Sequence, residues 1–200
     1  MRVVDDDASV LRSLGRLLRS AGFAVRTFPS SQEFLQQHDA DAPGCVVLDL
    51  SMPGLNGLQL QQALARFESP CPVIFITGYG DVPASVQAMK AGAIDFLLKP
   101  FDQSQLLNAV RAAIEKDRSS RAARAERSSL GAKVAALTPR EREVMAHVVA
   151  GRLNKQIAAE LGTAEKTVKV HRARVMKKMG VGSVAELVSL VGAAKAFSPD

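Results

Sequence analysis

The sequence predicts two domains, an α/β domain built on a doubly wound five-stranded parallel sheet and an all-α helix-turn-helix domain. Two observations support this prediction. In residues 1–112, five short apolar runs alternate with five helical patterns. Such alternation requires a parallel sheet with right-handed crossovers, for which we expect the strand order 2-1-3-4-5. In residues 137–200 only helical patterns occur, and a glycine turn separates two of them, as in a helix-turn-helix.

The five expected strands are short runs of apolar, mostly β-branched residues with polar ends. The run from Cys45 to Leu48 leads directly into Asp49 and is typical of a buried central strand. The first run is unusually short, so we expect the natural protein to begin a few residues before Met1. In chain order, the strands are expected at Arg2–Val4, Phe23–Thr27, Cys45–Leu48, Val73–Ile76 and Ile94–Leu98.

The helices that alternate with these strands are predicted from apolar residues at helical spacing and from their capping residues. Ser9 or Asp7 can cap the first helix, and Gly22 ends it. In the fourth helix, Val86 and Met89 are expected to face the core. The helices are expected at Ser9–Ala21, 31–37, Leu58–Phe67, Val82–Ala91 and from Gln103 onward.

Residues 113–136 are rich in Ala, Arg, Glu and Ser, and they contain few large apolar side chains. They form either an extension of the fifth helix or a disordered linker, and the helix propensity of Ala and Arg favours the extension. Beyond them, Thr138, Pro139 and Glu141 have the pattern of a capping box. The C-terminal helices are expected from Pro139 up to Gly151, at Asn154–Leu161, at Glu165–Met179 and at Ser183–Ala194.

The composition favours a protein with aliphatic cores that works in the cytoplasm. Hydrophobic residues make up 47% of the chain, only 4% are aromatic, and no apolar run is long enough for a bilayer or a signal peptide. Cys45 and Cys71 lack the spacing of a zinc site or a disulfide framework. The net charge is −2 over residues 1–112, +3 over 113–136 and +5 over 137–200. Nucleic acid is therefore expected to bind the C-terminal part, and a membrane is not an expected partner.

The candidate reaction site consists of polar residues at the carboxyl ends of the strands, where ligands collect in open α/β sheets. Asp5 and Asp6 follow the first strand, Asp49 the third, Thr77 the fourth and Lys99 the fifth. We expect Asp49 to accept a phosphoryl group as an acyl phosphate. Repulsion among these carboxylates and the phosphoryl group calls for a divalent cation, and oxygen ligands favour Mg²⁺ or Mn²⁺. Lys99 would pair with Asp49 or a phosphoryl oxygen, and the Thr77 hydroxyl would donate to another.

Each of these residues also has an ordinary structural explanation. A pair of aspartates in a loop is more often a turn or a helix cap, and Asp7 is assigned to the cap for that reason. Thr77 is equally consistent with a turn and Lys99 with a surface charge. The functional interpretation therefore depends on all of them following predicted strands in the appropriate order.

Four segments resemble the receiver domain of two-component response regulators, namely Val3–Asp7, Leu48–Gly57, Ile76–Asp81 and Met89–Phe101. The resemblance implies phosphotransfer from a sensor histidine kinase to Asp49, with no enzymatic activity beyond slow autodephosphorylation. It implies that Mg²⁺ is held by Asp6, Asp49 and the main-chain carbonyl of Ser51, with Asp5 acting through water.

The same resemblance implies that Thr77 and Phe96 form a switch pair, although a plain core position also explains Phe96. It implies that activated receivers dimerise through the fourth helix and fifth strand, Val82–Leu98. The Lys99–Pro100 bond is often cis in this family. Tyr79 departs from the pattern, because FixJ-like proteins commonly carry His there.

The C-terminal part resembles the LuxR-type helix-turn-helix in three segments, Leu137–Val144, Asn154–Gly162 and Glu165–Met179. Together with the receiver-like part, these segments resemble the NarL/FixJ group of response regulators, and Gly80–Phe101 favours its FixJ branch. The resemblance implies a transcription factor that binds double-stranded promoter DNA as a dimer and acts on RNA polymerase. The last helix could supply the dimer contact on DNA.

The segment Glu165–Met179 is the expected recognition helix. Its spacing directs Val168, Val175 and Met179 to the core and places a separate cationic face at Lys166, Lys169, Val170, Ala173 and Lys177. Lysine donates to guanine edges and small apolar groups meet thymine methyls. The resemblance assigns base contacts to Lys169, Val170 and Ala173, and phosphate contacts to Lys155, Thr167, His171, Arg172, Lys177 and Lys178.

Two other classes of protein are alternatives. The acidic site suits a phosphatase with an aspartate nucleophile, but neither the general acid nor the substrate cap of such an enzyme is recognisable. The receiver-like part suits a passive dimerisation module with constitutive DNA binding, but every phosphorylation residue is in place.

Overall fold

The computed structural model describes residues 1–67, 71–78 and 82–195, with side chains up to Gly192. Tyr79, the predicted departure from the family pattern, lies outside the described residues. The chain divides into two compact units, Met1–Ala122 and Ala123–Asp200, and each unit is described on its own.

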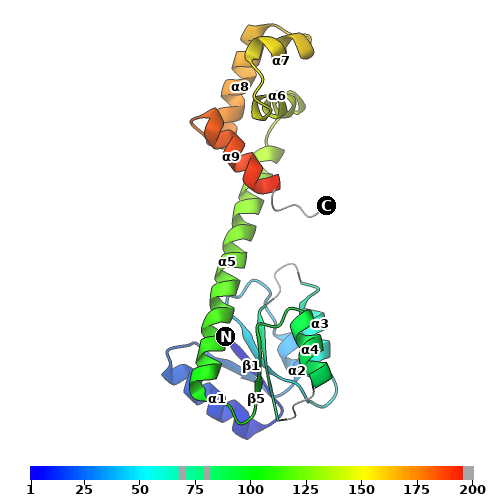
Figure 1. The fold of residues 1–200 in the computed structure, drawn as a ribbon, viewed down its shortest axis with the longest axis vertical. Coiled ribbons are helices and arrows are strands. Elements are labelled where there is room, and N and C mark those ends of the chain that lie inside the picture. The colour runs from blue at the N-terminus through cyan, green and yellow to red at the C-terminus, as the bar shows by residue number, and fades with distance from the viewer. Residues whose placement is uncertain (68–70, 79–81, 196–200) are drawn as a thin grey trace. The chain divides into compact units, whose positions relative to one another are not determined.

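The first unit contains the predicted five-stranded parallel sheet in the order β2-β1-β3-β4-β5 (Figure 1). Leu48 lies opposite Val4 of β1 and Phe75 of β4, so β3 is hydrogen-bonded on both edges. The predicted fold class is therefore confirmed. The strands are β1 (Arg2–Val4), β2 (Arg26–Phe28), β3 (Val46–Asp49), β4 (Val73–Thr77) and β5 (Asp95–Leu98).

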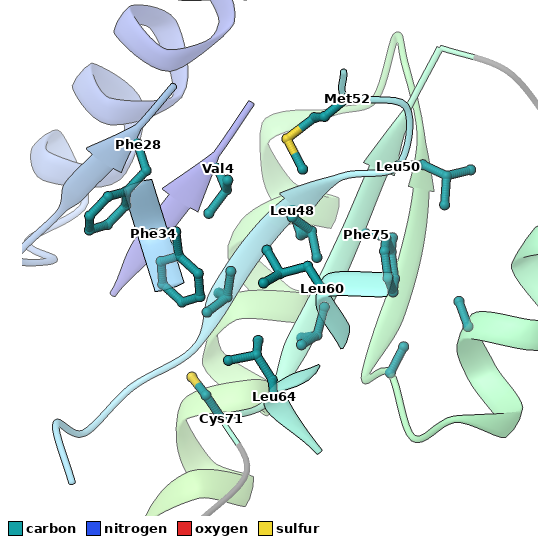
Figure 2. Packing of buried hydrophobic residues seen from close by; sticks show 14 of the residues in the cluster. Val4, Phe28, Phe34, Leu48, Leu50, Met52, Leu60, Leu64, Cys71 and Phe75 are labelled. Carbon is teal, nitrogen blue, oxygen red and sulfur yellow. The ribbon is translucent and has the colours of Figure 1, made fainter. Parts of the chain in front are cut away.

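Helices cover both faces of the sheet, so β1, β3 and β4 are buried throughout. Figure 1 shows α1 and α5 on one face and α2, α3 and α4 on the other. Alternate residues of β3 accordingly enter different cores: Val47 packs with α1 and α5, whereas Leu48 packs with Phe34, Leu60 and their neighbours (Figure 2). The helices are α1 (Ala8–Ser20), α2 (Ser31–Gln36), α3 (Gly57–Leu64), α4 (Val82–Lys90) and α5 (Gln103–Ala135).

Two details of the predicted elements were wrong. The second strand was expected at Phe23–Thr27 but runs from Arg26 to Phe28, because Arg26 is the residue that pairs with the first residue of β1. In α4, Val86 and Met89 were expected to face the core but are 46% and 45% exposed. The small residues of α4, Ala84 and Ala88, face the sheet instead.

Asp7, one of the two predicted caps, is the N-cap of α1, and its carboxylate accepts a hydrogen bond from the Ser9 N–H at 2.7 Å. Gly22 follows that helix with a φ of +89°, as expected for a helix-terminating glycine. The Lys99–Pro100 peptide bond is cis.

The helix α5 continues without a break from Gln103 to Ala135, through most of the predicted linker. Its middle turns are held by a set of contacts that we call the α5 clamp: the Asp117–Arg121 pair and the carbonyl groups of Ala40, Asp41 and Ala42. The Arg121 guanidinium donates to both Asp117 oxygens at 2.9 Å and to these carbonyl oxygens at 2.8 to 3.2 Å. Asp117, only 4% exposed, also accepts from the Gly44 N–H at 2.8 Å. None of the helices in the described part of the chain is both long and apolar enough to cross a membrane.

The second unit is a bundle of short helices around a separate core. The capping box predicted for its first helix is present, with Thr138 and Glu141 exchanging hydrogen bonds. Leu130 and Val134, at the end of α5, pack against the same core. The four helices are α6 (Pro139–Val149), α7 (Asn154–Glu160), α8 (Glu165–Met179) and α9 (Val184–Lys195), and Ser183 caps the last of them as predicted.

Candidate functional site

Asp49, the predicted phosphoacceptor, is the last residue of β3. The residue is 6% exposed, and its backbone continues a strand whose other three residues are fully buried. The Ser51 N–H donates to Asp49 Oδ2 at 2.7 Å. A buried strand and a short loop bond therefore hold this carboxylate in one orientation.

Gly57 allows the chain to turn back close behind Asp49. A Cβ atom on this residue would lie 2.4 Å from the Asp49 carbonyl oxygen and 2.9 Å from the Phe75 ring. The Gly57 N–H donates to the Leu50 carbonyl at 3.0 Å, so the first turn of α3 packs directly on the strand end. A side chain at this position would push α3 away from the residue that carries the candidate nucleophile.

Lys99 brings two of the predicted carboxylates together. Its ammonium group lies 2.9 Å from Asp5 Oδ2 and 2.8 Å from Asp49 Oδ1. Burial raises the pKa of Asp5, which is 1% exposed, and this effect outweighs the opposing hydrogen bond from Lys99. Burial on its own would lower the pKa of Lys99, but the hydrogen bonds to Asp49 and Asp5 outweigh it and raise that pKa. Lys99 is thus held protonated between two carboxyl groups.

The remaining predicted residues lie around this cluster at different depths. Asp6 follows Asp5 in sequence and is exposed, and Ser51 is exposed beside Asp49. Thr77 is buried at the end of β4, where its carbonyl accepts a hydrogen bond from the Lys99 N–H at 2.7 Å. The structure therefore collects these residues at one edge of the sheet.

Phe96 lies one strand away from Thr77 on the same face of the sheet. The register pairs Phe96 with Phe75 and Thr77 with Leu98, so Thr77 and Phe96 are diagonal neighbours on β4 and β5. Phe96 is partly buried, and its ring centroid lies 6.1 Å from that of Phe75. A change at the Thr77 side chain can therefore reach Phe96 across a single strand pair.

The carboxylates suit a Mg²⁺ ion that keeps part of its water shell. Within the described residues, no three Asp, Glu, His or Cys side chains converge to form a complete metal cage. Mg²⁺ in proteins is commonly bound by only one or two carboxylates together with waters and phosphate oxygens. Asp5 and Asp49 already converge on one cationic group, and the exposed Asp6 stands next to them. This donor set fits Mg²⁺ by its chemistry.

In the second unit, α8 presents the two faces that its spacing predicted. Val168, Val175 and Met179 are buried in the core, whereas Val170 is 43% exposed. Gly162 turns the chain between α7 and α8 with a φ of +61°, a backbone conformation that glycine adopts without strain. The exposed residues of the predicted DNA-contacting set are Lys155, Lys166, Thr167, Lys169, Val170, Ala173, Lys177 and Lys178.

Two cations predicted to contact phosphates have partners within the unit. Lys178 Nζ lies 2.6 Å from Glu141 and 3.0 Å from the Ala136 carbonyl oxygen. The Lys178 hydrogen bond is the main cause that lowers the pKa of the buried Glu141 to about 2. Arg172 is partly buried and donates to Asn154 Oδ1 at 3.0 Å. Through these contacts Lys178 joins α8 to α6, and Arg172 joins α8 to α7.

His171 is partly buried, and its Nδ1 has no hydrogen-bond partner in the described part of the chain. Sequence reasoning omitted Arg174, which is exposed on α8 one helical turn after Val170. The signal was available, because residues four apart share a helix face.

Two family models match the chain. Residues 1–111 match the response regulator receiver domain, and residues 135–191 match the luxR family of bacterial regulatory proteins. Receiver domains generally bind Mg²⁺ at their phosphorylation site. The chain therefore belongs to the two-component response regulators, as a transcription factor with a receiver domain and a LuxR-type DNA-binding domain.

Relatives of nearly full length place the chain more narrowly. It is 50% identical over 188 residues to nodulation protein W of Bradyrhizobium diazoefficiens, covering 94% of this chain and 83% of the relative. It is 45% identical over 188 residues to the transcriptional regulatory protein FixJ of the same organism, covering 94% and 92%. The solved structure of response regulator StyR superposes with a TM-score of 0.90 at 47% identity, covering 96% of each chain. Within the NarL/FixJ group, this chain is a FixJ-like response regulator.

Proposed function

We propose that the chain is a cytoplasmic regulator in which phosphorylation of Asp49 by a sensor histidine kinase controls binding to promoter DNA. The observation that most directly supports phosphorylation of Asp49 is the pair of contacts that the Lys99 ammonium group makes with Asp5 and Asp49 at the carboxyl end of the sheet. We assign residues 1–112 to the phosphoacceptor part, 113–136 to the linker and 137–200 to the DNA-binding part. Activated dimers would present two copies of α8 to promoter DNA and act on RNA polymerase.

The phosphoryl transfer follows from the groups around Asp49. One carboxylate oxygen attacks the phosphorus of a phosphohistidine, a P–O bond forms, the P–N bond breaks, and the imidazole leaves with its electron pair. The other oxygen keeps the Ser51 N–H, which holds the nucleophile in position. Lys99 is near enough to turn from Asp49 to a phosphoryl oxygen without losing Asp5.

A Mg²⁺ ion held by Asp6, Asp49 and the Ser51 carbonyl, with Asp5 acting through water, would offset the repulsion between carboxylate and phosphoryl oxygens. The Thr77 hydroxyl would donate to the phosphoryl group, and Phe96 would respond by changing its rotamer. The chain itself would catalyse at most slow loss of its own phosphoryl group. Sustained turnover of a phosphatase substrate would favour an enzyme instead.

The exposed apolar side chains of α4 and β5 support dimerisation through the face that these two elements form. Val82, Val86, Met89 and Leu98 are each at least 45% exposed, although large apolar side chains are usually buried. A second receiver could cover them through the same surface on its own α4 and β5, as in a two-fold dimer. The helix α9 would supply the dimer contact of the DNA-binding part.

The proposal is tested by labelling the full chain with a small phosphodonor and Mg²⁺. The native chain should gain one acid-stable, base-labile acyl phosphate, dimerise and bind DNA more tightly, and Asp49→Asn should abolish all three changes. Asp7→Asn is the matched control, because Asp7 is an exposed carboxylate that caps α1. Normal labelling of Asp49→Asn would overturn the site assignment. Equal DNA affinity with and without phosphodonor would favour constitutive binding.

A further inference from the structure

Arg174 is a cation on α8 that lies outside the predicted DNA-contacting set. It is exposed and lies one helical turn after Val170, on the side of α8 away from the buried Val168, Val175 and Met179. We propose that Arg174 is a specificity-determining residue that reads a base in the DNA site. The proposal rests on DNA binding through α8 and adds a residue to it.

Three neighbouring cations of α8 differ from Arg174 because they have intramolecular partners. Arg172 donates to Asn154, Lys178 binds Glu141, and Lys169 lies 3.7 Å from Glu165. For Arg174 the described part of the chain provides neither a hydrogen bond nor an ion pair. Its guanidinium group therefore gives up no protein partner when it meets a ligand.

The surroundings of Arg174 suit base reading. A guanidinium group donates two parallel hydrogen bonds to O6 and N7 of guanine in the major groove. Val170, one turn earlier, presents an exposed apolar side chain of the kind that meets a thymine methyl. Ala173, the preceding residue, is exposed and small, which leaves room for the longer side chain beside it. Arg174 therefore extends the proposed base-facing stripe by one turn.

Base reading and phosphate binding by Arg174 have different consequences. A phosphate contact strengthens binding to all DNA sequences alike, whereas a guanine contact strengthens binding only where that guanine is present. The experiment therefore compares selected with unselected DNA at one fixed salt concentration, because both kinds of contact weaken with salt.

The probe is a pool of random double-stranded oligonucleotides, enriched by several rounds of binding to the phosphodonor-treated full chain. Affinities for the enriched and the unenriched pools are then measured for the native chain, Arg174→Ala, Arg174→Lys and the control Arg118→Ala. Arg118 is an exposed arginine of α5, so its removal matches the change in net charge. Thermal unfolding of each variant verifies that it is folded.

Arg174→Ala should bind the enriched pool about 5- to 150-fold more weakly, the equivalent of about 1–3 kcal/mol, and the unenriched pool nearly as well as the native chain. A pool enriched by Arg174→Ala should lose one guanine preference in each half-site, and Arg174→Lys should retain part of it. An equal loss on both pools would overturn base reading in favour of a phosphate contact, and no loss on either would overturn the contact itself. If the native chain enriches no sequence at all, the proposed DNA-binding function fails first.

Discussion

The α5 clamp makes a sharp prediction about the substitution Arg121→Ala. This substitution removes the five hydrogen bonds that the guanidinium donates to Asp117 and to three loop carbonyls. Asp117, whose side chain is 5% exposed in the native structure, keeps its hydrogen bond from Gly44 but loses its cationic partner. We therefore expect the first unit to be destabilised and the middle of α5 to be released from it.

The magnitude follows from the burial of the pair. Removing one partner of a fully buried ion pair costs about 3–5 kcal/mol, because a charge is left buried without compensation. The Arg121 side chain is 24% exposed, so water can enter the space it leaves and screen part of this cost. With the Gly44 bond retained, we expect a loss of about 2–3 kcal/mol in the free energy of unfolding of the first unit. For a unit of this size, that loss lowers the melting temperature by roughly 6–12 °C.

The assay is urea unfolding of the full chain combined with peptide-resolved hydrogen exchange. Exchange separates the first unit from the second, whose unfolding should be unchanged. Arg118→Ala is the matched control, since Arg118 lies three residues earlier and pairs on the surface with the exposed Glu115. If Arg121→Ala and Arg118→Ala unfold at the same urea concentration and exchange alike over residues 112–123, the clamp does not stabilise α5 and the reasoning is refuted.

Two further predictions concern the close approach behind Asp49 and the buried carboxylate of the second unit. Gly57→Ala should destabilise the first unit by about 1–3 kcal/mol in urea unfolding, because its methyl group would clash with the β3 backbone. The control Gly131→Ala, which has open space around it in α5, should instead stabilise the chain by about 0.5–1 kcal/mol. Equal changes in the free energy of unfolding for the two variants would contradict this prediction. The folded pKa of Glu141, about 2, lies below its ordinary 4.5, so its ion pair with Lys178 stabilises the second unit above pH 4.5, and this contribution is lost as the pH falls toward 2. Lys178→Ala should flatten the pH dependence of the melting temperature in that window and Lys177→Ala should not, which acid titrations of both variants would decide.

The residues of the reaction site could be predicted from sequence because each depends on a local pattern. A buried strand ends where its apolar run ends, so Asp5, Asp49, Thr77 and Lys99 were recognisable as strand-end residues before their distances were known. The parallel topology then determines that those ends share one edge of the sheet. The sequence predicted that Lys99 would pair with Asp49 or a phosphoryl oxygen, and the structure has the contact with Asp49. What the sequence could not supply is that Lys99 also contacts Asp5.

Contacts between distant residues explain the wrong prediction for α4 and a partner of Lys178 that its position in the sequence does not indicate. Val86 and Met89 are apolar at helical spacing, but Ala84 and Ala88 are small enough to bring α4 close to the sheet. Lys178 has the position of a phosphate-binding cation at the end of a recognition helix, yet its partner Glu141 lies 37 residues earlier in the chain.

The α5 clamp was missed for a similar reason. Asp117 and Arg121 are spaced like an ordinary surface ion pair on a helix. Their burial depends on the loop at residues 40–44, about 75 to 80 residues earlier in the chain. In both units, local sequence patterns predicted where each helix or strand lies. Contacts between residues far apart in the chain then determine which side chains of that element are buried or paired.

The position of the clamp also bears on how phosphorylation would reach DNA. Gly44, which donates to Asp117, precedes β3, and Asp49 ends it, so the clamp and the phosphoacceptor lie at opposite ends of the same strand. That strand is fully enclosed and paired on both edges, and such packing resists deformation. Thr77, Phe96 and the exposed side chains of α4 and β5 offer a shorter route, which leads to the proposed dimer surface. We therefore infer that the signal passes through dimerisation. At a temperature where the variants are folded, Arg121→Ala should still dimerise in response to phosphodonor, whereas Met89→Asp should not. Sedimentation of both variants with and without phosphodonor would decide, and loss of dimerisation in Arg121→Ala would direct the signal through α5 instead.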